Sequence, residues 1–196
     1  TVELIRGEWR DYRYNLDSRV NIPAEGEAAV TKVNIEENAG RVPVNYVLPP
    51  GVTRIVDSGQ SQVTQLNEQS LQIKMTDLPS GETHGVYRNT SIDLRIYKRL
   101  QMFVHQEALV DDYRHLQDGD MAVIIRLGTD VKNNYYEYEI PLTITPPGKY
   151  STNSTSDRLI VWPEENMLDC DLDVFTTVKR NRNQQKAQGV PGVGFT

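Results

Sequence analysis

Residues 93–109 read DLRIYKRLQMFVHQEAL, residues 121–127 read MAVIIRL and residues 135–140 read YYEYEI. These short apolar or alternating runs are separated by acidic and Asn/Gly-rich turns, a pattern that is typical of the middle of an antiparallel β-sandwich. The run 121–127 is almost continuously apolar, so it predicts a central strand that is covered on both faces. We expect the stretch 93–144 to form the structural centre of the domain, and it contains no catalytic constellation.

The β pattern continues on both sides of this stretch. Leu71, Ile73 and Met75 alternate with polar residues, which predicts a half-buried strand, and the alternation from Leu172 to Val178 predicts the last strand. Further strands are expected at residues 4–14, 31–35, 42–48, 85–89, 98–109 and 159–162, with one helical turn or a tight bend at 93–97. The expected fold class is therefore mainly β, an antiparallel β-sandwich.

The chain is expected to form one domain with a tail. All-β sandwiches of this length are commonly single units, so residues 1–183 are assigned to one β-sandwich domain. Residues 184–196 are Gln-rich and then Gly/Pro-rich, which indicates a linker or tail. No signal-peptide pattern follows Thr1 and the first residues are already strand-like, so we expect a segment of a longer protein or a mature chain.

Composition excludes several classes of function. The net charge is −6 and the pI about 5.1, which disfavours nucleic acid as a partner, because phosphate binding needs a basic face. The densest basic cluster is Lys179, Arg180 and Arg182. A mean hydropathy of −0.54 without a long apolar stretch predicts a soluble domain with no direct membrane insertion. The single Cys170 can close no internal disulfide and build no multi-cysteine zinc site.

The titratable residues give no strong metal or catalytic pattern. His84, His105 and His115 lack the spacing of a zinc enzyme, so no metal or other cofactor is assigned. The acidic residues at 169, 171 and 173 would share one face of a strand, where repulsion favours solvent or a cation such as calcium. Glu137 and Glu139 have about the separation of a glycosidase pair, but no cleft signal supports catalysis. We expect the protein not to be an enzyme.

The tyrosines indicate an interaction role instead. The chain has ten Tyr against three Phe and two Trp, and tyrosine suits protein contacts or sugar stacking. Tyr135, Glu137 and Glu139 fall on one face of their expected strand. They form the candidate interaction surface, which would contact another protein or a glycan.

Four segments together carry a family resemblance: IRGEWRDYRY at 5–14, DLRIYKRLQMFVHQEAL at 93–109, YYEYEIPL at 135–142, and VWPEENMLD at 161–169 with KRNRN at 179–183. With them the chain resembles the SprA/Sov family of giant Bacteroidetes cell-surface proteins. The resemblance covers most of this chain and a small part of a far longer family member. None of the motifs is an active-site signature.

The resemblance implies an outer-membrane protein of the type IX secretion system, whose large β-barrel is the translocon for cargo proteins and supports gliding motility in some members. This chain would be a soluble, non-catalytic domain of that protein, associated with the outer membrane and placed on its cell-surface side. Its partners would be the rest of the parent barrel and other secretion components.

Separately, the 93–105 pattern followed by the apolar strand and YYEYEIPL resembles the core of galactose-binding-like jelly rolls. Such folds serve carbohydrate binding, calcium binding and pure scaffolding alike. A carbohydrate-binding jelly-roll module is therefore the alternative function.

Overall fold

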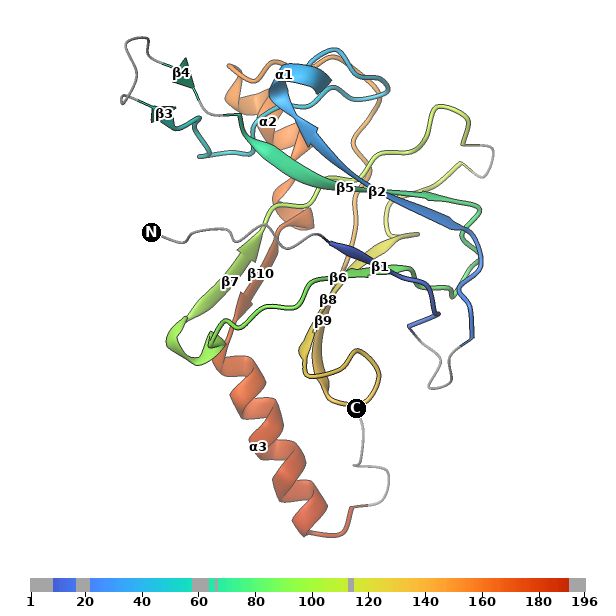
Figure 1. Ribbon diagram of the computed structural model, residues 1–196, viewed down its shortest axis with the longest axis vertical. Helices are drawn as coiled ribbons and strands as arrows, with labels where there is room; N and C mark the ends of the chain where they lie inside the picture. Colours follow the sequence, from blue (N-terminus) through green and yellow to red (C-terminus); the bar gives the residue numbers. More distant parts are fainter. Residues whose placement is uncertain (1–8, 17–21, 58–63, 66, 113–114, 191–196) are drawn as a thin grey trace.

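The computed structural model describes residues 9–16, 22–57, 64–65, 67–112 and 115–190 (Figure 1). Short strands dominate this part of the chain. The strands are β1 Arg10–Tyr12, β2 Glu27–Asn34, β3 Val56–Asp57, β4 Thr64–Gln65, β5 Gln69–Thr76, β6 Gly85–Tyr87, β7 Arg99–Met102, β8 Ala122–Gly128, β9 Tyr135–Pro141 and β10 Leu168–Asp171. The helices are α1 Ile35–Asn38, α2 Thr155–Val161 and α3 Asp173–Ala187, with 3-10 turns η1 Leu94–Ile96 and η2 Glu164–Asn166.

The strands pair in twos, and every pair is antiparallel. Within the described residues the pairs are β1–β6, β2–β5, β3–β4, β7–β10 and β8–β9 (Figure 1). The predicted β-rich, antiparallel character is confirmed, whereas neither a sandwich nor a jelly roll is confirmed. The prediction of a central strand at 121–127 is wrong, because β8 pairs with β9 alone among the described strands.

Several predicted elements are confirmed. The run with Leu71, Ile73 and Met75 forms β5, which pairs over eight residues with β2. The predicted helical turn at 93–97 is η1, and the strand at 85–89 is β6. Of the strand expected at 4–14, residues 10–12 form β1, and residues 1–8 lie outside the described residues.

One predicted strand is shorter than expected, and another is not formed. The strand expected at 98–109 is β7, which ends at Met102, where its partner strand begins at Leu168. Residues 42–48 form no strand, because Pro43 interrupts the segment, and Val44 makes only an isolated bridge with Gly148.

The strand predicted at 159–162 is wrong, because this segment lies in and just after helix α2. Ser154 caps the helix, and its Oγ accepts a hydrogen bond from the backbone N–H of Asp157 at 3.2 Å. A serine three residues before an acid is a helix-start signal, and it outweighs the short apolar run that follows. The cap places Val161 and Trp162 in the core.

The strand predicted from Leu172 to Val178 is also wrong, because residues 173–187 form helix α3. Val174 and Val178 fit the i, i+4 spacing of a helix as well as the i, i+2 spacing of a strand. A helix satisfies its own backbone hydrogen bonds, whereas a strand here would need a neighbouring edge. The helix extends past residue 183, so the first residues assigned to the tail are helical.

The buried core lies away from the stretch 93–144. It consists of Val33, Val44, Tyr46, Val47, Leu48, Val161 and Trp162, against which Ile35, Phe103 and Tyr150 pack. Only Phe103 of this group comes from 93–144. The expectation that 93–144 is the structural centre is therefore wrong for the main core, although the stretch supplies the β8–β9 hairpin.

Asparagine side chains hold the irregular core segments in place. Asn45 donates from Nδ2 to the carbonyl of Tyr150 at 2.9 Å and accepts the Tyr150 N–H at 2.8 Å. Asn166 does the same with Thr143, accepting its N–H at 2.7 Å and donating to its carbonyl at 2.8 Å. Each side-chain amide thus replaces the backbone partner that a neighbouring strand would provide.

Candidate interaction surface

The β8–β9 hairpin carries the residues of the candidate interaction surface, and its turn is fixed by Asp130. The Asp130 carboxylate accepts hydrogen bonds from the N–H of Lys132 at 2.9 Å, the N–H of Asn133 at 2.5 Å and Nδ2 of Asn134 at 2.6 Å. These bonds, led by the one from Asn133, lower the pKa of Asp130 from 3.8 to about 2. The turn sets the register in which Gly128 lies opposite Tyr135.

The structure places Tyr135, Glu137 and Glu139 on one face of β9, as the alternation predicts. Glu137 and Glu139 are exposed and Tyr135 is half-buried. Arg126 lies opposite Glu137 on β8 and donates from Nε to Glu137 Oε2 at 2.5 Å, while its guanidinium carbon lies 4.3 Å from the centroid of the Tyr135 ring. Two of the three residues are therefore joined through a cation that the sequence analysis did not identify.

Arg126 also connects this face to other segments. Its side chain is 9% exposed, and Nη1 donates to the carbonyls of Leu16 at 3.0 Å and Val131 at 2.9 Å. A cation with this many oxygen acceptors is held in a single orientation. The face therefore presents a fixed arrangement of Tyr135, Arg126 and Glu137, with Glu139 beside them.

The opposite face of β9 is turned toward the C-terminal part of the chain. The ring of Tyr136 lies 5.2 Å from the ring of Phe175 on α3, and the Tyr138 hydroxyl donates to the carbonyl of Asp169 on β10 at 3.3 Å. These two contacts orient β9, because they engage one face of the strand and leave Glu137 and Glu139 on the other.

The acidic run at 169–173 does not form the predicted row on one strand. Asp169 and Asp171 lie on β10, whereas Asp173 begins α3, and its N–H donates to Asp171 Oδ1 at 3.1 Å. Arg99 donates to both carboxylate oxygens of Asp169, each at 2.5 Å, and these bonds lower the pKa of Asp169. Burial raises the pKa of the neighbouring Cys170 thiol. Arg99 therefore places a positive charge beside Asp169, where the sequence pattern predicts solvent or a cation such as calcium.

His105 belongs to a polar cluster at the edge of the core. Its Nδ1 lies 2.8 Å from the carbonyl oxygen of Val161, and its Nε2 lies 3.2 Å from Glu107 Oε2. Arg41 donates to both oxygens of Glu107, at 2.5 and 2.7 Å. The Thr145 hydroxyl lies 3.1 Å from His105 Nδ1. The cluster joins four separate segments, which is what a structural polar network does.

The other two histidines are placed elsewhere. Both ring nitrogens of His84 are buried and have no hydrogen-bond partner among the described residues, and His115 has a φ of 52°. In the described part of the chain no group of three or more His, Cys, Asp or Glu side chains could hold a metal ion.

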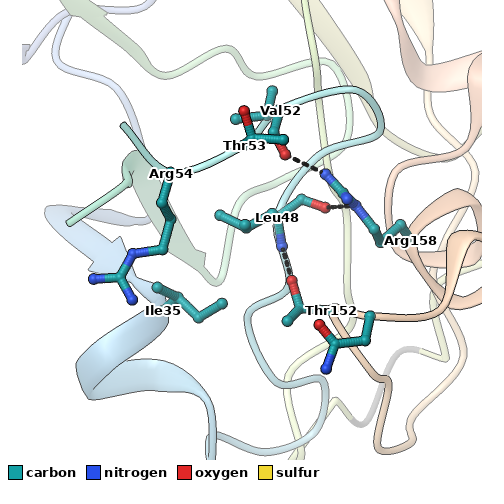
Figure 2. Close-up of a pocket in the computed structure, with 8 residues that line it drawn as sticks. Ile35, Leu48, Val52, Thr53, Arg54, Thr152 and Arg158 are labelled. Atoms are coloured by element: carbon teal, nitrogen blue, oxygen red, sulfur yellow. Dashed lines mark hydrogen bonds between the residues drawn. The ribbon is translucent and has the colours of Figure 1, made fainter. Parts of the chain in front are cut away.

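A pocket of about 320 Å³ lies beside α2 (Figure 2). Two cations lie on opposite sides of it, and both are engaged: Arg158 donates from Nε to the carbonyl of Leu48 at 2.8 Å and from Nη2 to that of Val52 at 2.6 Å, while Arg54 pairs with Glu36 at 2.5 Å. The residues that line the pocket are Ile35, Leu48, Val52, Thr53, Arg54, Thr152, Asn153 and Arg158. These described residues include no carboxylate, histidine or cysteine, so they supply no general base of the usual kind to activate the hydroxyl of Thr53 or Thr152.

The chain matches the model of a known protein family. The model of the family SprA_N, described as motility related/secretion protein, matches residues 1–190. A search of curated proteins found no match. Among the described residues, no helix combines the length and apolar character needed to cross a membrane.

Proposed function

Because the chain belongs to the SprA_N family of motility-related and secretion proteins, we propose that it is a non-catalytic structural and interaction domain of an outer-membrane protein translocon. The translocon would be that of type IX secretion, which also supports gliding motility. The domain would lie on the cell-surface side, in contact with the rest of the parent barrel and other secretion components. A sandwich or galactose-binding-like jelly roll would then be completed by strands of the parent protein.

The observation that carries the proposal is an apolar sheet face without cover. Leu71 and Ile73 of β5 are 38% and 39% exposed and share one face with Val30, which lies opposite Ile73 on β2. Neighbouring apolar side chains on one face of a long ribbon indicate a contact with another protein segment. Among the described strands, β2 and β5 pair only with each other, so their outer edges are also open to a further strand.

The test is made in a strain that produces the parent protein. Deletion of residues 2–182 should reduce both cargo secretion and translocon assembly; unchanged values for both would refute the proposal. A sharper comparison replaces Leu71 and Ile73 by Ser. Gln72 and Lys74 lie on the other face of the same strand, and the matched control replaces these two residues by Ser. Secretion should fall with the first pair and remain with the second, at equal amounts of parent protein in the outer membrane.

The carbohydrate-binding alternative rests on exposed aromatic rings. Trp9, Tyr14 and Tyr97 are 45%, 40% and 47% exposed, and such rings stack on sugars. A glycan array that gives no binder even at high ligand concentration would count against this alternative. Catalysis by Glu137 and Glu139 is less favoured, because Glu137 is already engaged in an ion pair with Arg126.

A further inference from the structure

Helix α3 forms one end of the molecule along its longest axis (Figure 1). None of its fifteen residues is buried; Phe175 and Arg182 are half-buried and the others are exposed. The ring contact of Phe175 with Tyr136 anchors its first turn to β9. Beyond that turn the helix extends away from the strands that hold it.

The residues of α3 have a low intrinsic helix propensity for a helix with little packing against other elements. Val, Thr and Asn occupy several of its positions, and these residues favour a helix less than Ala, Leu or Glu. A helix of this length is marginal in water unless packing stabilises one face. Asp173 in the first turn and Lys186 in the last complement the helix dipole, which adds only a fraction of a kcal/mol for each, about 0.3–1. We therefore expect another surface to stabilise α3.

The charges of α3 indicate that the surface which stabilises it is acidic. Lys179, Arg182 and Lys186 are spaced i, i+3 and i+7, so they lie on one face, which we call the basic stripe. No Asp or Glu occurs from residue 174 to 196, whereas the preceding residues hold 17 of the 21 Lys/Arg and all 27 Asp/Glu. Among the described residues no carboxylate forms an ion pair with Lys179 or Lys186.

We propose that α3 docks through the basic stripe onto an acidic protein surface, whose carboxylates pair with Lys179 and Lys186 on either side of Arg182. Such pairing gives the two lysines partners that they do not have among the described residues, and it supplies packing for the exposed helix. Asn and Gln side chains lie between the cations and suit hydrogen bonds to a polypeptide. This surface is separate from the β5 face, and the inference holds whether or not the chain serves a translocon.

An anionic membrane fits this helix less well. Helices that lie in a membrane interface carry an apolar face along their length, with the cations on the other face. In α3 the large apolar residues end at Val178, and residues 179–186 read KRNRNQQK. The basic half of the helix therefore has nothing to insert between lipids.

The test uses the full chain labelled with ¹⁵N, followed by NMR and far-UV circular dichroism. The acidic probe is poly-L-glutamate at pH 7, and the lipid probe is vesicles of phosphatidylglycerol. The test variant is Lys179→Gln/Arg182→Gln/Lys186→Gln. The matched control is Lys32→Gln/Lys74→Gln/Lys149→Gln, which removes the same number of charges from exposed positions outside α3.

Poly-L-glutamate should shift the amide signals of residues 173–187 and increase helicity. The loss of the three charges of the stripe, of which those of Lys179 and Lys186 are exposed, corresponds to binding about tenfold weaker in the test variant, while the control should bind as the original chain does. Unchanged β8–β9 amide signals will show that the variants are folded. Equal weakening in both variants, no binding at all, or a shift of the α3 signals by vesicles but not by poly-L-glutamate would overturn the inference.

Discussion

Replacing Asn166 by Ala tests whether single side chains hold the irregular core together. Asn166 is completely buried, and its amide pairs with both backbone groups of Thr143. The substitution leaves the N–H and the carbonyl of the half-buried Thr143 without these partners. Each unsatisfied group costs about 1–3 kcal/mol, and partial access to water favours the lower half of that range, so the free energy of unfolding should fall by about 2–4 kcal/mol. A domain of ordinary stability has only about 5–15 kcal/mol in total.

Urea denaturation followed by tryptophan fluorescence measures this loss, because Trp162 is 7% exposed in the folded chain. The matched control is Asn153→Ala at an exposed position, which should change the free energy of unfolding by less than about 0.5 kcal/mol. A loss below about 1 kcal/mol for Asn166→Ala, with an unchanged denaturant slope, would refute the reasoning, because water would then satisfy the two groups without cost.

Three further predictions concern the polar network, the hairpin turn and the root of α3. Replacing Glu107 by Gln should lower the free energy of unfolding by about 1–3 kcal/mol in urea titrations, because the half-buried Arg41 loses its carboxylate; no change would show that solvent screens the pair. The folded-state pKa of Asp130, about 2, lies below its usual 3.8, so its contribution to stability is complete above about pH 4 and is lost as the pH falls toward 2. The thermal unfolding temperature should change less between pH 4 and pH 2 in Asp130→Asn than in the original chain. An identical change in both would contradict the stabilising role of the Asp130 carboxylate. Phe175→Ala should weaken the anchor of α3 by about 1 kcal/mol and speed amide exchange at 173–187 about fivefold, with β8–β9 unchanged; equal acceleration in both would indicate global unfolding instead.

The elements that could be predicted are those whose periodicity points to one structure. The alternation around Leu71 and Ile73 predicts β5, and the acidic and Asn-rich turns predict both ends of the β8–β9 hairpin. The position of Glu137 and Glu139 on one face follows from the same alternation. The period of a strand fixes which side chains share a face without any knowledge of the neighbours.

The elements that could not be predicted depend on partners far away in the chain. Residues 172–178 satisfy the spacing of both a strand and a helix, and the segment forms helix α3, which meets its own backbone hydrogen bonds without a pairing strand. Arg126 could be found only once β8 was in register with β9, because the register places it opposite Glu137. The cluster of Arg41, His105 and Glu107 likewise requires segments 66 residues apart to meet.

The sequence by itself determined the β-rich class, the hairpin around residues 121–140 and the family, because each depends on local periodicity or on residue identity along the chain. The tertiary structure alone decided where the core lies and which charges are neutralised. Val44, Tyr46 and Leu48 are buried although their segment is not a strand, because Asn45, Trp162 and Arg158 bond to its backbone or pin it to distant residues. Burial and ion pairing depend on which residues lie close together in space, and periodicity along the chain does not reveal which distant residues meet.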